Sequence, residues 1–388
     1  MCTIQSGPLL LAPLLLRHLT RNSTLNLRGV SAAAAARARR KREVPDLEDL
    51  QERAQASKGF RRFIADPDLA REVLRCLEPA DLSRRGAQIW ECNPGPGILT
   101  QTLLDAGARV VALERDKVFL PDLKSLEHKA DGQLDVLHCD FFKLDPLSQG
   151  PVKPPSMYSE MLFQKLGMTE VPWTADVPVK VVGLFPDKTE KSMLWKLIYA
   201  LYERISIFRY GRIQLNMFIS EKEYMKLIAV PGEMRNYQAI SVLYQTACHM
   251  ELLLMEPWSS FLTSSRMGGL VIPKSTRLPN EHLCLVRITP RRDLFSHSLT
   301  SANSTTFVVM MKQCFARRTA KLITRLETWI PGHGRNLLRQ LELPENILIG
   351  HVTAEQYQRL FEVMEHSGEF NKSWIFDEIL ENREKNVF

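Results

Sequence analysis

Residues 89–100 read I-W-E-C-N-P-G-P-G-I-L-T, and this stretch decides the fold. A short apolar run ends in the turn 93–97, and a helical pattern follows it. Glycine allows a backbone to pass close to a ligand, and the N-terminus of a helix favours a negatively charged group. The stretch therefore predicts a strand, a turn and a helix that together bind a cofactor through Asn93, Gly95 and Gly97.

Acidic residues end the next two predicted strands. Residues 109–114 read R-V-V-A-L-E and end at Glu114, and residues 134–138 are followed closely by Asp140. Open α/β sheets bind ligands at the carboxyl ends of their strands. Glu114 is suited to accept both ribose hydroxyls of a nucleoside, and Asp140 to accept from an adenine amino group. One such acid alone is more often merely solvated, but three features at successive strand ends favour a nucleoside cofactor.

Strands alternate with helical segments through the first two thirds of the chain, which predicts βαβ units and a mainly parallel sheet. After about residue 295 the pattern becomes helical. We therefore predict a Rossmann-like α/β domain over 60–290 and a smaller helical domain over 291–388. The further strands are expected at 179–182 and 213–219, and the early helices at 69–77 and 98–106.

The N-terminus has a composition of its own. Residues 1–42 hold eight basic side chains and no acidic one, which is typical of a mitochondrial presequence. A secretory signal places its positive charge before the apolar run, whereas here every arginine follows residues 9–16. A secretory signal and a disordered basic tail remain the alternatives. We predict a transit peptide over 1–42, a linker over 43–59 and import into the mitochondrial matrix.

The net charge of +7 is unevenly distributed. Without residues 1–42 the chain carries 43 basic and 44 acidic residues, so the body is close to neutral. Within it, residues 266–340 hold 13 basic against three acidic side chains, and residues 341–388 hold ten acidic against four basic ones. This asymmetry favours a nucleic-acid surface beside an acidic tail.

A basic, partly apolar run at residues 307–326 is the densest part of that segment. Its apolar residues recur at helical spacing, which predicts one amphipathic helix. The simpler interpretation of its charges is a solvated helix face. Within so basic a segment they favour contacts to the phosphates of a single strand. The candidate residues are Lys312, Arg317, Arg318, Lys321 and Arg325.

The sequence predicts no membrane-spanning helix, no zinc site and no disulfide framework. No apolar run approaches the roughly 20 residues that a membrane-spanning helix needs. The seven cysteines lack the C-x-x-C spacing of a zinc site, and their odd number argues against a disulfide framework.

The order of these motifs resembles the rRNA adenine dimethyltransferase family. Its first motif reads E-x-G-x-G-x-G-x-L-T, and Asn93 here replaces the first glycine. The family places Q-N-F-L-x-D beside the cofactor, and residues 61–66 read R-R-F-I-A-D, which retains the apolar position at Ile64 but loses the Gln-Asn pair. The resemblance implies a class I fold, S-adenosyl-L-methionine as cofactor, and Glu114 and Asp140 as its ribose and adenine ligands.

The catalytic motif of that family is broken in this chain. The family holds the target adenine with N-[LI]-P-[FY], and residues 183–187 read G-L-F-P-D. Leu184 occupies the Asn position (Gly183 if the register slips), and Asp187 stands where the aromatic residue belongs. Asp187 or a backbone carbonyl could substitute; otherwise we expect weak or residual methylation. The degenerate motif comprises Gly183, Leu184, Phe185 and Pro186.

Three further stretches resemble the mitochondrial transcription factor B group within this family. They are H-C-D-F-F-K-L-D-P at 138–146, V-P-W-T-A-D at 171–176 and M-E-P-W-S-S-F at 255–261. The resemblance implies mitochondrial RNA polymerase, mitochondrial transcription factor A at promoters and single-stranded promoter DNA as partners, within the nucleoid. The alternative function is an active N6,N6-dimethyltransferase of mitochondrial small-subunit rRNA.

A Pro-rich stretch at residues 145–178 is too long for an ordinary connection. Two interpretations are open: a surface loop, or an insertion that meets a partner.

Overall fold

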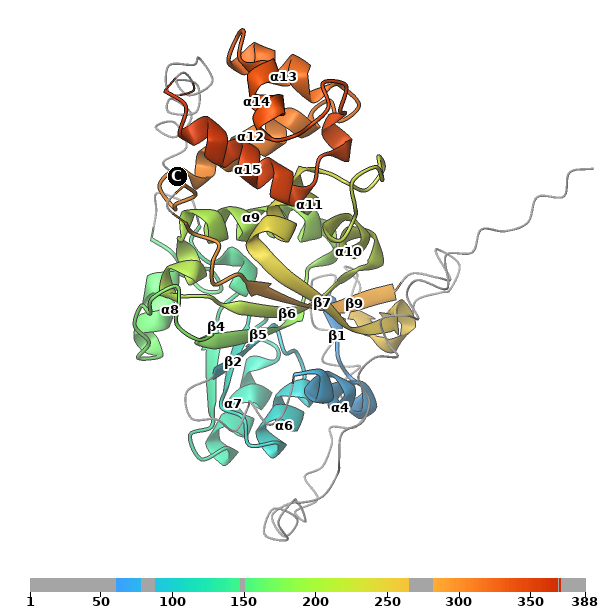
Figure 1. The fold of residues 1–388 in the computed structure, drawn as a ribbon. Helices are drawn as coiled ribbons and strands as arrows, with labels where there is room; N and C mark the ends of the chain where they lie inside the picture. Colours follow the sequence, from blue (N-terminus) through green and yellow to red (C-terminus); the bar gives the residue numbers. More distant parts are fainter. Residues whose placement is uncertain are drawn as a thin grey trace, which may run out of the picture. The chain divides into compact units, whose positions relative to one another are not determined.

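The computed structural model describes residues 61–77, 88–146, 151–264, 282–296, 298–368 and 370. The predicted transit peptide (1–42) and linker (43–59) lie outside these ranges. The described chain forms a seven-stranded sheet in the order β4-β3-β2-β5-β6-β9-β7, and a separate pair of strands, β1 and β8 (Figure 1). The strands are β1 (Arg61–Phe63), β2 (Gln88–Cys92), β3 (Val110–Glu114), β4 (Leu134–His138), β5 (Val179–Leu184), β6 (Gln214–Ser220), β7 (Cys248–Pro257), β8 (Leu262–Ser264) and β9 (His282–Pro290).

The parallel half of the sheet explains why its strands were visible in the sequence. Strands β4, β3, β2, β5 and β6 pair in parallel, and every residue of β2 and β3 is buried. Strands covered on both faces read as continuous apolar runs. The strand predicted before the turn 93–97 is β2, the predicted strand at 134–138 matches β4, and β5 continues two residues beyond the predicted 179–182. The Rossmann-like fold class is confirmed.

Helices cover both faces of the sheet (Figure 1). Adjacent residues of a strand point to opposite faces, so Ile89 packs in the apolar cluster with helices α4 and α6, whereas Trp90 packs in the cluster with α9 and α11. The helices are α4 (Pro67–Cys76), α6 (Ile98–Asp105), α7 (Leu120–Lys129), α8 (Ser159–Lys165), α9 (Glu190–Glu203), α10 (Glu221–Leu227), α11 (Ala239–Ala247), α12 (Ser304–Phe315), α13 (Leu322–Trp329), α14 (Gly334–Gln340) and α15 (Ala354–Glu365).

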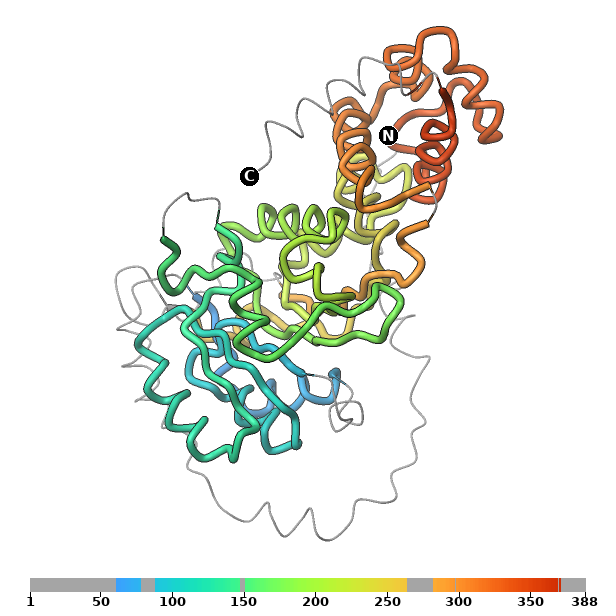
Figure 2. Tube along the Cα trace, turned by 90° about the vertical axis from the view of Figure 1, so that its left-hand side faces the viewer, coloured from blue at the N-terminus to red at the C-terminus, as the bar shows by residue number. Residues whose placement is uncertain are grey.

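The C-terminal helices share their hydrophobic core with the sheet domain. Phe307 of α12 packs against Tyr202 of α9, with ring centroids 5.8 Å apart. The hydroxyl of Tyr237, just before α11, donates to the carbonyl of Val352 at 2.8 Å. Figure 2 shows the same neighbourhood, with the orange and red segments against the yellow-green ones. Strand β9 ends at Pro290 and only helices follow it in the described chain, within one continuous core; the division into two domains stays a prediction.

The predicted single helix over 307–326 is wrong. Helix α12 ends at Phe315 and α13 begins at Leu322, with a turn between them. Backbone pairing with a distant loop breaks the helix: Gly350 N–H donates to the carbonyl of Arg318 at 2.8 Å, and Ile349 N–H to that of Ala320 at 3.0 Å. Ala320 in the turn packs against the same core as the two helices, so apolar residues recur on both sides of the break.

The insertion at 145–178 is more than a surface loop. Its described part contains α8, and Phe163 is fully buried, stacking on Tyr210 at 3.6 Å and lying 4.7 Å from Trp90. Trp173 is also buried, and its indole N–H donates to the carbonyl of Arg291 at 3.0 Å. The insertion thus supplies buried residues to the hydrophobic core on the side of the sheet that α9 covers.

Within the described ranges, no helix has the length and apolar character required to cross a bilayer.

Candidate cofactor site and basic surface

The glycine-rich turn lies between β2 and α6, beside β5, where the strand order of the sheet reverses. Asn93, Gly95 and Gly97 all have positive φ, at 54°, 62° and 82°. A Cβ at position 95 would lie 2.3 Å from the ring of Phe63, so the close approach of that ring requires glycine. The structure therefore places the three predicted turn residues at the ligand-binding edge of the sheet.

Glu114 ends β3 at the same edge and is fully buried. Its carboxylate accepts the backbone N–H of Gly95 at 2.8 Å and that of Asp116 at 2.6 Å. It also accepts hydrogen bonds from both terminal nitrogens of Arg61, at 2.7 Å and 3.0 Å. Each carboxylate oxygen thus accepts one backbone and one guanidinium hydrogen bond.

Arg61 is the residue that the sequence analysis missed. Its side chain is 4% exposed, and its Nη2 also donates to the carbonyl of Asn93 at 3.1 Å. The guanidinium lies 4.6 Å from the ring centre of Phe63 and 5.3 Å from that of Phe119. The available signal was the replacement of a family glutamine by arginine, a charge that needs a nearby acid when buried.

These contacts test whether the residues fit a nucleoside cofactor. A ribose diol bound by Glu114 would donate two hydrogen bonds to the carboxylate, which has about four acceptor positions. Arg61, Gly95 and Asp116 already supply four donors. In this arrangement the residues at the cofactor edge do not fit the ribose of S-adenosyl-L-methionine.

Asp140 lies at the same edge, just past the end of β4, and is 2% exposed. Its carboxylate accepts the N–H of Phe142 at 3.1 Å and caps a short 3-10 helix, while its own N–H donates to the carbonyl of Pro155 at 2.7 Å. Burial, and then the charge of Arg61, lower the pKa of the neighbouring Arg115. The insertion thus contacts, through Pro155, the residue predicted to bind adenine.

Two other residues of the cofactor motifs are buried. Ile64 packs within the apolar cluster that contains Phe63. Glu91 of β2 accepts the hydroxyl of Thr100 at 2.6 Å, and burial, reinforced by the charge of Glu114, raises the pKa of Glu91 to about 8. Burial thus favours the protonated form of Glu91 in the folded protein.

The degenerate catalytic motif follows the same strand edge. A Cβ on Gly183 would lie 2.9 Å from the carbonyl oxygen of Cys92, so β2 and β5 require glycine there. Leu184 ends β5 and packs against the apolar cluster of the α6 face. Phe185 is buried, with its ring 5.1 Å from that of Phe142. Pro186 follows, and the motif offers no polar side chain before Asp187.

Asp187 occupies the place of the family's aromatic residue and pairs with Arg62 at 2.9 Å. The Arg62 side chain is 11% exposed and lies 5.2 Å from the ring centre of Trp258. Both arginines of the R-R-F-I-A-D run are therefore paired with acids: Arg61 with Glu114 at the cofactor edge, and Arg62 with the residue that replaces the family's aromatic one.

The five candidate nucleic-acid residues divide into two groups. Lys312 faces α9, with its Nζ 4.7 Å from the ring centre of Tyr199 and 5.2 Å from that of Trp195. Arg317 and Arg318 lie in the turn after α12, Lys321 precedes α13 and Arg325 lies on it. The structure pairs none of the five with a described acidic side chain.

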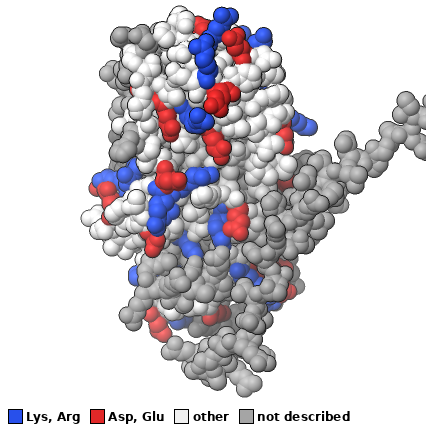
Figure 3. Space-filling model, viewed as in Figure 1, with Lys and Arg blue, Asp and Glu red and all other residues white. Residues whose placement is uncertain are grey.

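Part of the basic segment 266–340 lies outside the described residues, and some of the described arginines in it are paired. Arg287 pairs with Glu251 at 2.9 Å and Arg292 with Asp176 at 2.8 Å, so part of the positive charge is neutralised locally. Figure 3 shows acidic side chains among the basic ones over the C-terminal helices on that face. Within the described residues, the candidate cations without an acidic partner include those of the turn 316–321 and the start of α13.

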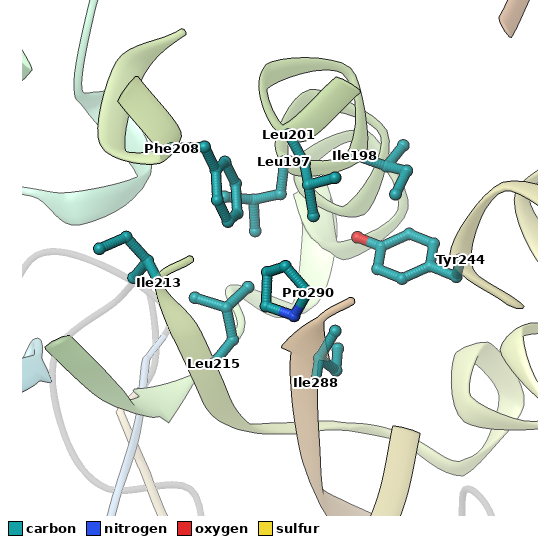
Figure 4. A pocket seen from close by; sticks show the side chains of 9 residues that line it. All are labelled: Leu197, Ile198, Leu201, Phe208, Ile213, Leu215, Tyr244, Ile288 and Pro290. Atoms are coloured by element: carbon teal, nitrogen blue, oxygen red, sulfur yellow. The ribbon is translucent and has the colours of Figure 1, made fainter. Parts of the chain in front are cut away.

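Two cavities lie elsewhere. One of about 10 Å³ lies between α9 and the sheet and is lined by apolar side chains and the ring of Tyr244 (Figure 4). It is at the limit of what a single water fills. A surface pocket of about 530 Å³ lies between α14 and α15. Neither contains a residue of the cofactor edge. Among the residues that the structure describes, no cluster of acidic, histidine or cysteine side chains could hold a metal ion.

The fold and the strand-edge motifs define a class I methyltransferase architecture. The profile of the ribosomal RNA adenine dimethylase family matches residues 54–366, and the chain belongs to this family of S-adenosylmethionine-dependent methyltransferases. The family resemblance found in the sequence is confirmed.

Individual relatives narrow the match. The chain is 46% identical over 343 residues to "Dimethyladenosine transferase 2, mitochondrial" of Homo sapiens, covering 87% of this chain and 86% of that protein. It is 46% identical over 320 residues to the protein of the same name from Rattus norvegicus, covering 81% and 80%. A dimethyladenosine transferase structure from Plasmodium falciparum has the same fold, with a TM-score of 0.50, 14% identity and coverage of 76% and 94%. Both of these relatives are named mitochondrial, in agreement with a mitochondrial location of this chain.

Proposed function

We propose that this chain works mainly as a mitochondrial transcription initiation factor, on a methyltransferase fold with weak or residual activity. It would act with mitochondrial RNA polymerase in melting the promoter and holding the melted strand. The observation that carries the proposal is the altered base site, where Leu184 replaces asparagine and Asp187 is paired with Arg62.

Methylation of an adenine amino group requires the base to be flipped out and held in line with the methyl donor. Leu184 offers no acceptor for that amino group, and the Arg62–Asp187 pair takes the place of an aromatic stacking surface. Loss of one positioned group costs roughly tenfold to a thousandfold in rate. The chain has the methyltransferase fold but lacks the groups that hold the target base, which favours a role in binding over one in catalysis.

The basic turn supports a nucleic-acid partner. Arg317 and Lys321 are exposed, and neither is paired with a described acid. Unpaired cations on a surface bind phosphates without reading sequence, which suits single-stranded promoter DNA in the open complex.

The proposed place of action follows from the presequence composition and from the names of the relatives. An acid-free basic N-terminus is typical of a presequence that directs import, and a role at promoter DNA would put the protein in the matrix nucleoid. There it would meet mitochondrial transcription factor A at promoters.

Run-off transcription from a linear promoter template tests the proposal. Purified mitochondrial RNA polymerase and transcription factor A would be assayed with and without the mature protein. We expect transcripts from the duplex promoter only when the protein is present, and weaker dependence on it when the start site is already melted. Equal run-off with and without the protein on duplex DNA would refute the proposal.

The alternative is an active N6,N6-dimethyltransferase of mitochondrial small-subunit rRNA that binds S-adenosyl-L-methionine. The gathering of Gly95, Gly97, Glu114 and Asp140 at one sheet edge favours it. Transfer of labelled methyl groups to an adenine-bearing rRNA hairpin distinguishes the two. A rate equal to that of a family member with an intact base-holding motif, on the same hairpin, would favour the alternative.

A further inference from the structure

We propose that Arg61 is a built-in occupant of the ribose position, so that the native protein does not bind S-adenosyl-L-methionine or S-adenosylhomocysteine. The inference is independent of the transcription role, because it concerns the state of the nucleoside site alone.

The first step of the argument is the saturation of Glu114. The Arg61 guanidinium faces both carboxylate oxygens, at 2.7 Å and 3.0 Å, in the paired geometry that a ribose diol would require. The backbone N–H groups of Gly95 and Asp116 take the remaining acceptor positions. A ribose can reach this carboxylate only if Arg61 leaves it.

The second step is that leaving is unfavourable. The side chains of Arg61 and Glu114 are 4% and 0% exposed. Separating a buried pair leaves an uncompensated charge, and the guanidinium would also lose the carbonyl of Asn93 and the faces of Phe63 and Phe119. The ligand would have to supply that free energy from its own binding, which lowers its apparent affinity.

The third step is that the backbone carrying Arg61 is fixed. Strand β1 pairs antiparallel with β8, with Arg61 opposite Ser264 and Phe63 opposite Leu262. The ring of Phe63 packs directly over Gly95. Arg61 is therefore anchored by its strand and is not a surface side chain that swings in.

The fourth step is that the neighbouring Arg62 is also paired with an acid. Consecutive strand residues point to opposite sides, and Arg62 pairs with Asp187 at the position of the target base. One short strand thus closes the nucleoside side and the base side together. Its two arginines stand where the family motif has uncharged glutamine and asparagine.

Isothermal titration with S-adenosylhomocysteine tests the inference on the full mature protein. The native protein should give no binding heat at millimolar ligand. Arg61→Gln removes the guanidinium, leaves Glu114 in place, and should raise the affinity by at least about a hundredfold. Arg71→Gln is the matched control, since Arg71 is an exposed α4 arginine paired with Asp68, and it should behave as the native protein does.

Thermal unfolding with and without the ligand provides a second measurement of binding if Arg61→Gln is less stable than the native protein. A ligand that binds only the folded state raises the midpoint of unfolding. S-adenosylhomocysteine should therefore raise the midpoint of Arg61→Gln and leave that of the native protein unchanged. The double variant Arg61→Gln/Glu114→Gln has neither charge, and it should fold without responding to the ligand.

Two results would overturn the inference. One is native protein that binds S-adenosylhomocysteine as tightly as Arg61→Gln does. The other is a folded Arg61→Gln protein that shows neither binding heat nor ligand stabilisation. Run-off transcription by the native protein is measured separately, so the ligand-binding result can be interpreted even if the transcription proposal fails.

Discussion

Arginines at the cofactor edge and arginines in the turn after α12 have opposite surroundings. Arg61 is buried against a fully buried carboxylate, whereas Arg317 is exposed and is not paired with any acid in the described part of the chain. A count of charges treats the two alike. Burial and pairing decide which of them is part of the fold and which remains available to a ligand.

The comparison also separates two energetic roles. A buried ion pair is costly to break because the remaining charge stays desolvated. An exposed cation contributes little to folding, yet it strengthens nucleic-acid binding because it releases counterions from the phosphate that it contacts. Substitutions should therefore affect stability at the first region and ligand binding at the second.

The largest effect is expected at the buried pair. Arg61→Ala should lower the free energy of unfolding by about 3–5 kcal/mol, because Glu114 would keep its charge without its main partner. Urea denaturation followed by circular dichroism measures this. A loss comparable to that of a surface substitution would show that Glu114 is solvated, and the contrast between the regions would fail.

A pH-dependent effect is expected at Glu91. Burial raises its pKa from the usual value near 4.5 to about 8, so between these pH values the folded protein holds a proton that the unfolded chain has lost. The unfolding free energy should therefore fall as the pH rises through this window, at up to about 1.4 kcal/mol per pH unit, and then level off. Glu91→Gln stays neutral and should remove this fall. Denaturation curves at about pH 5, 7 and 9 for both proteins decide it.

A smaller effect is expected at the half-exposed pair. Arg62→Ala should cost about 0.5–1 kcal/mol, because the Asp187 side chain is 41% exposed and water screens the interaction. Asp187→Asn should cost a similar amount. Denaturation of both single variants and the double variant gives the coupling, and a coupling near zero would mean that the pair does not hold β1 at the base side.

The smallest effect on stability is expected at the turn. Arg317→Ala/Arg318→Ala should change the unfolding free energy by less than about 0.5 kcal/mol. Binding to single-stranded DNA should nevertheless weaken for any sequence, and the salt dependence should flatten by about 0.7 log units per log of salt for each lost contact. Fluorescence anisotropy over a salt series measures both. An unchanged slope would show that these arginines merely solvate the turn.

The sequence predicted the parallel sheet well because its strands are buried on both faces and are bounded by clear turns. Gly95, Glu114 and Asp140 were found by local order alone, since each follows a strand whose carboxyl end faces one edge. Their roles in binding a ligand stay predictions. Their common position at one edge of the sheet could be predicted because each follows a strand of the parallel sheet.

The features that the sequence did not predict depend on residues far apart in the chain. The Arg61–Glu114 pair joins two motifs across the strand edge, and no local pattern indicates that the arginine turns inward. The break in the predicted helix at 316–321 comes from backbone pairing with residues 347–350. In both cases the local pattern was ambiguous and a long-range contact decided between the alternatives.

The pairing of β1 with β8 sets an order of events during synthesis. Residues 61–63 leave the ribosome early, but their partners at 262–264 emerge only after all five parallel strands have been made. Until then the nucleoside edge can form without Arg61 fixed over it. A nascent chain would thus pass through a stage in which an adenosyl ligand could still enter, and completion of the C-terminal half would end that stage.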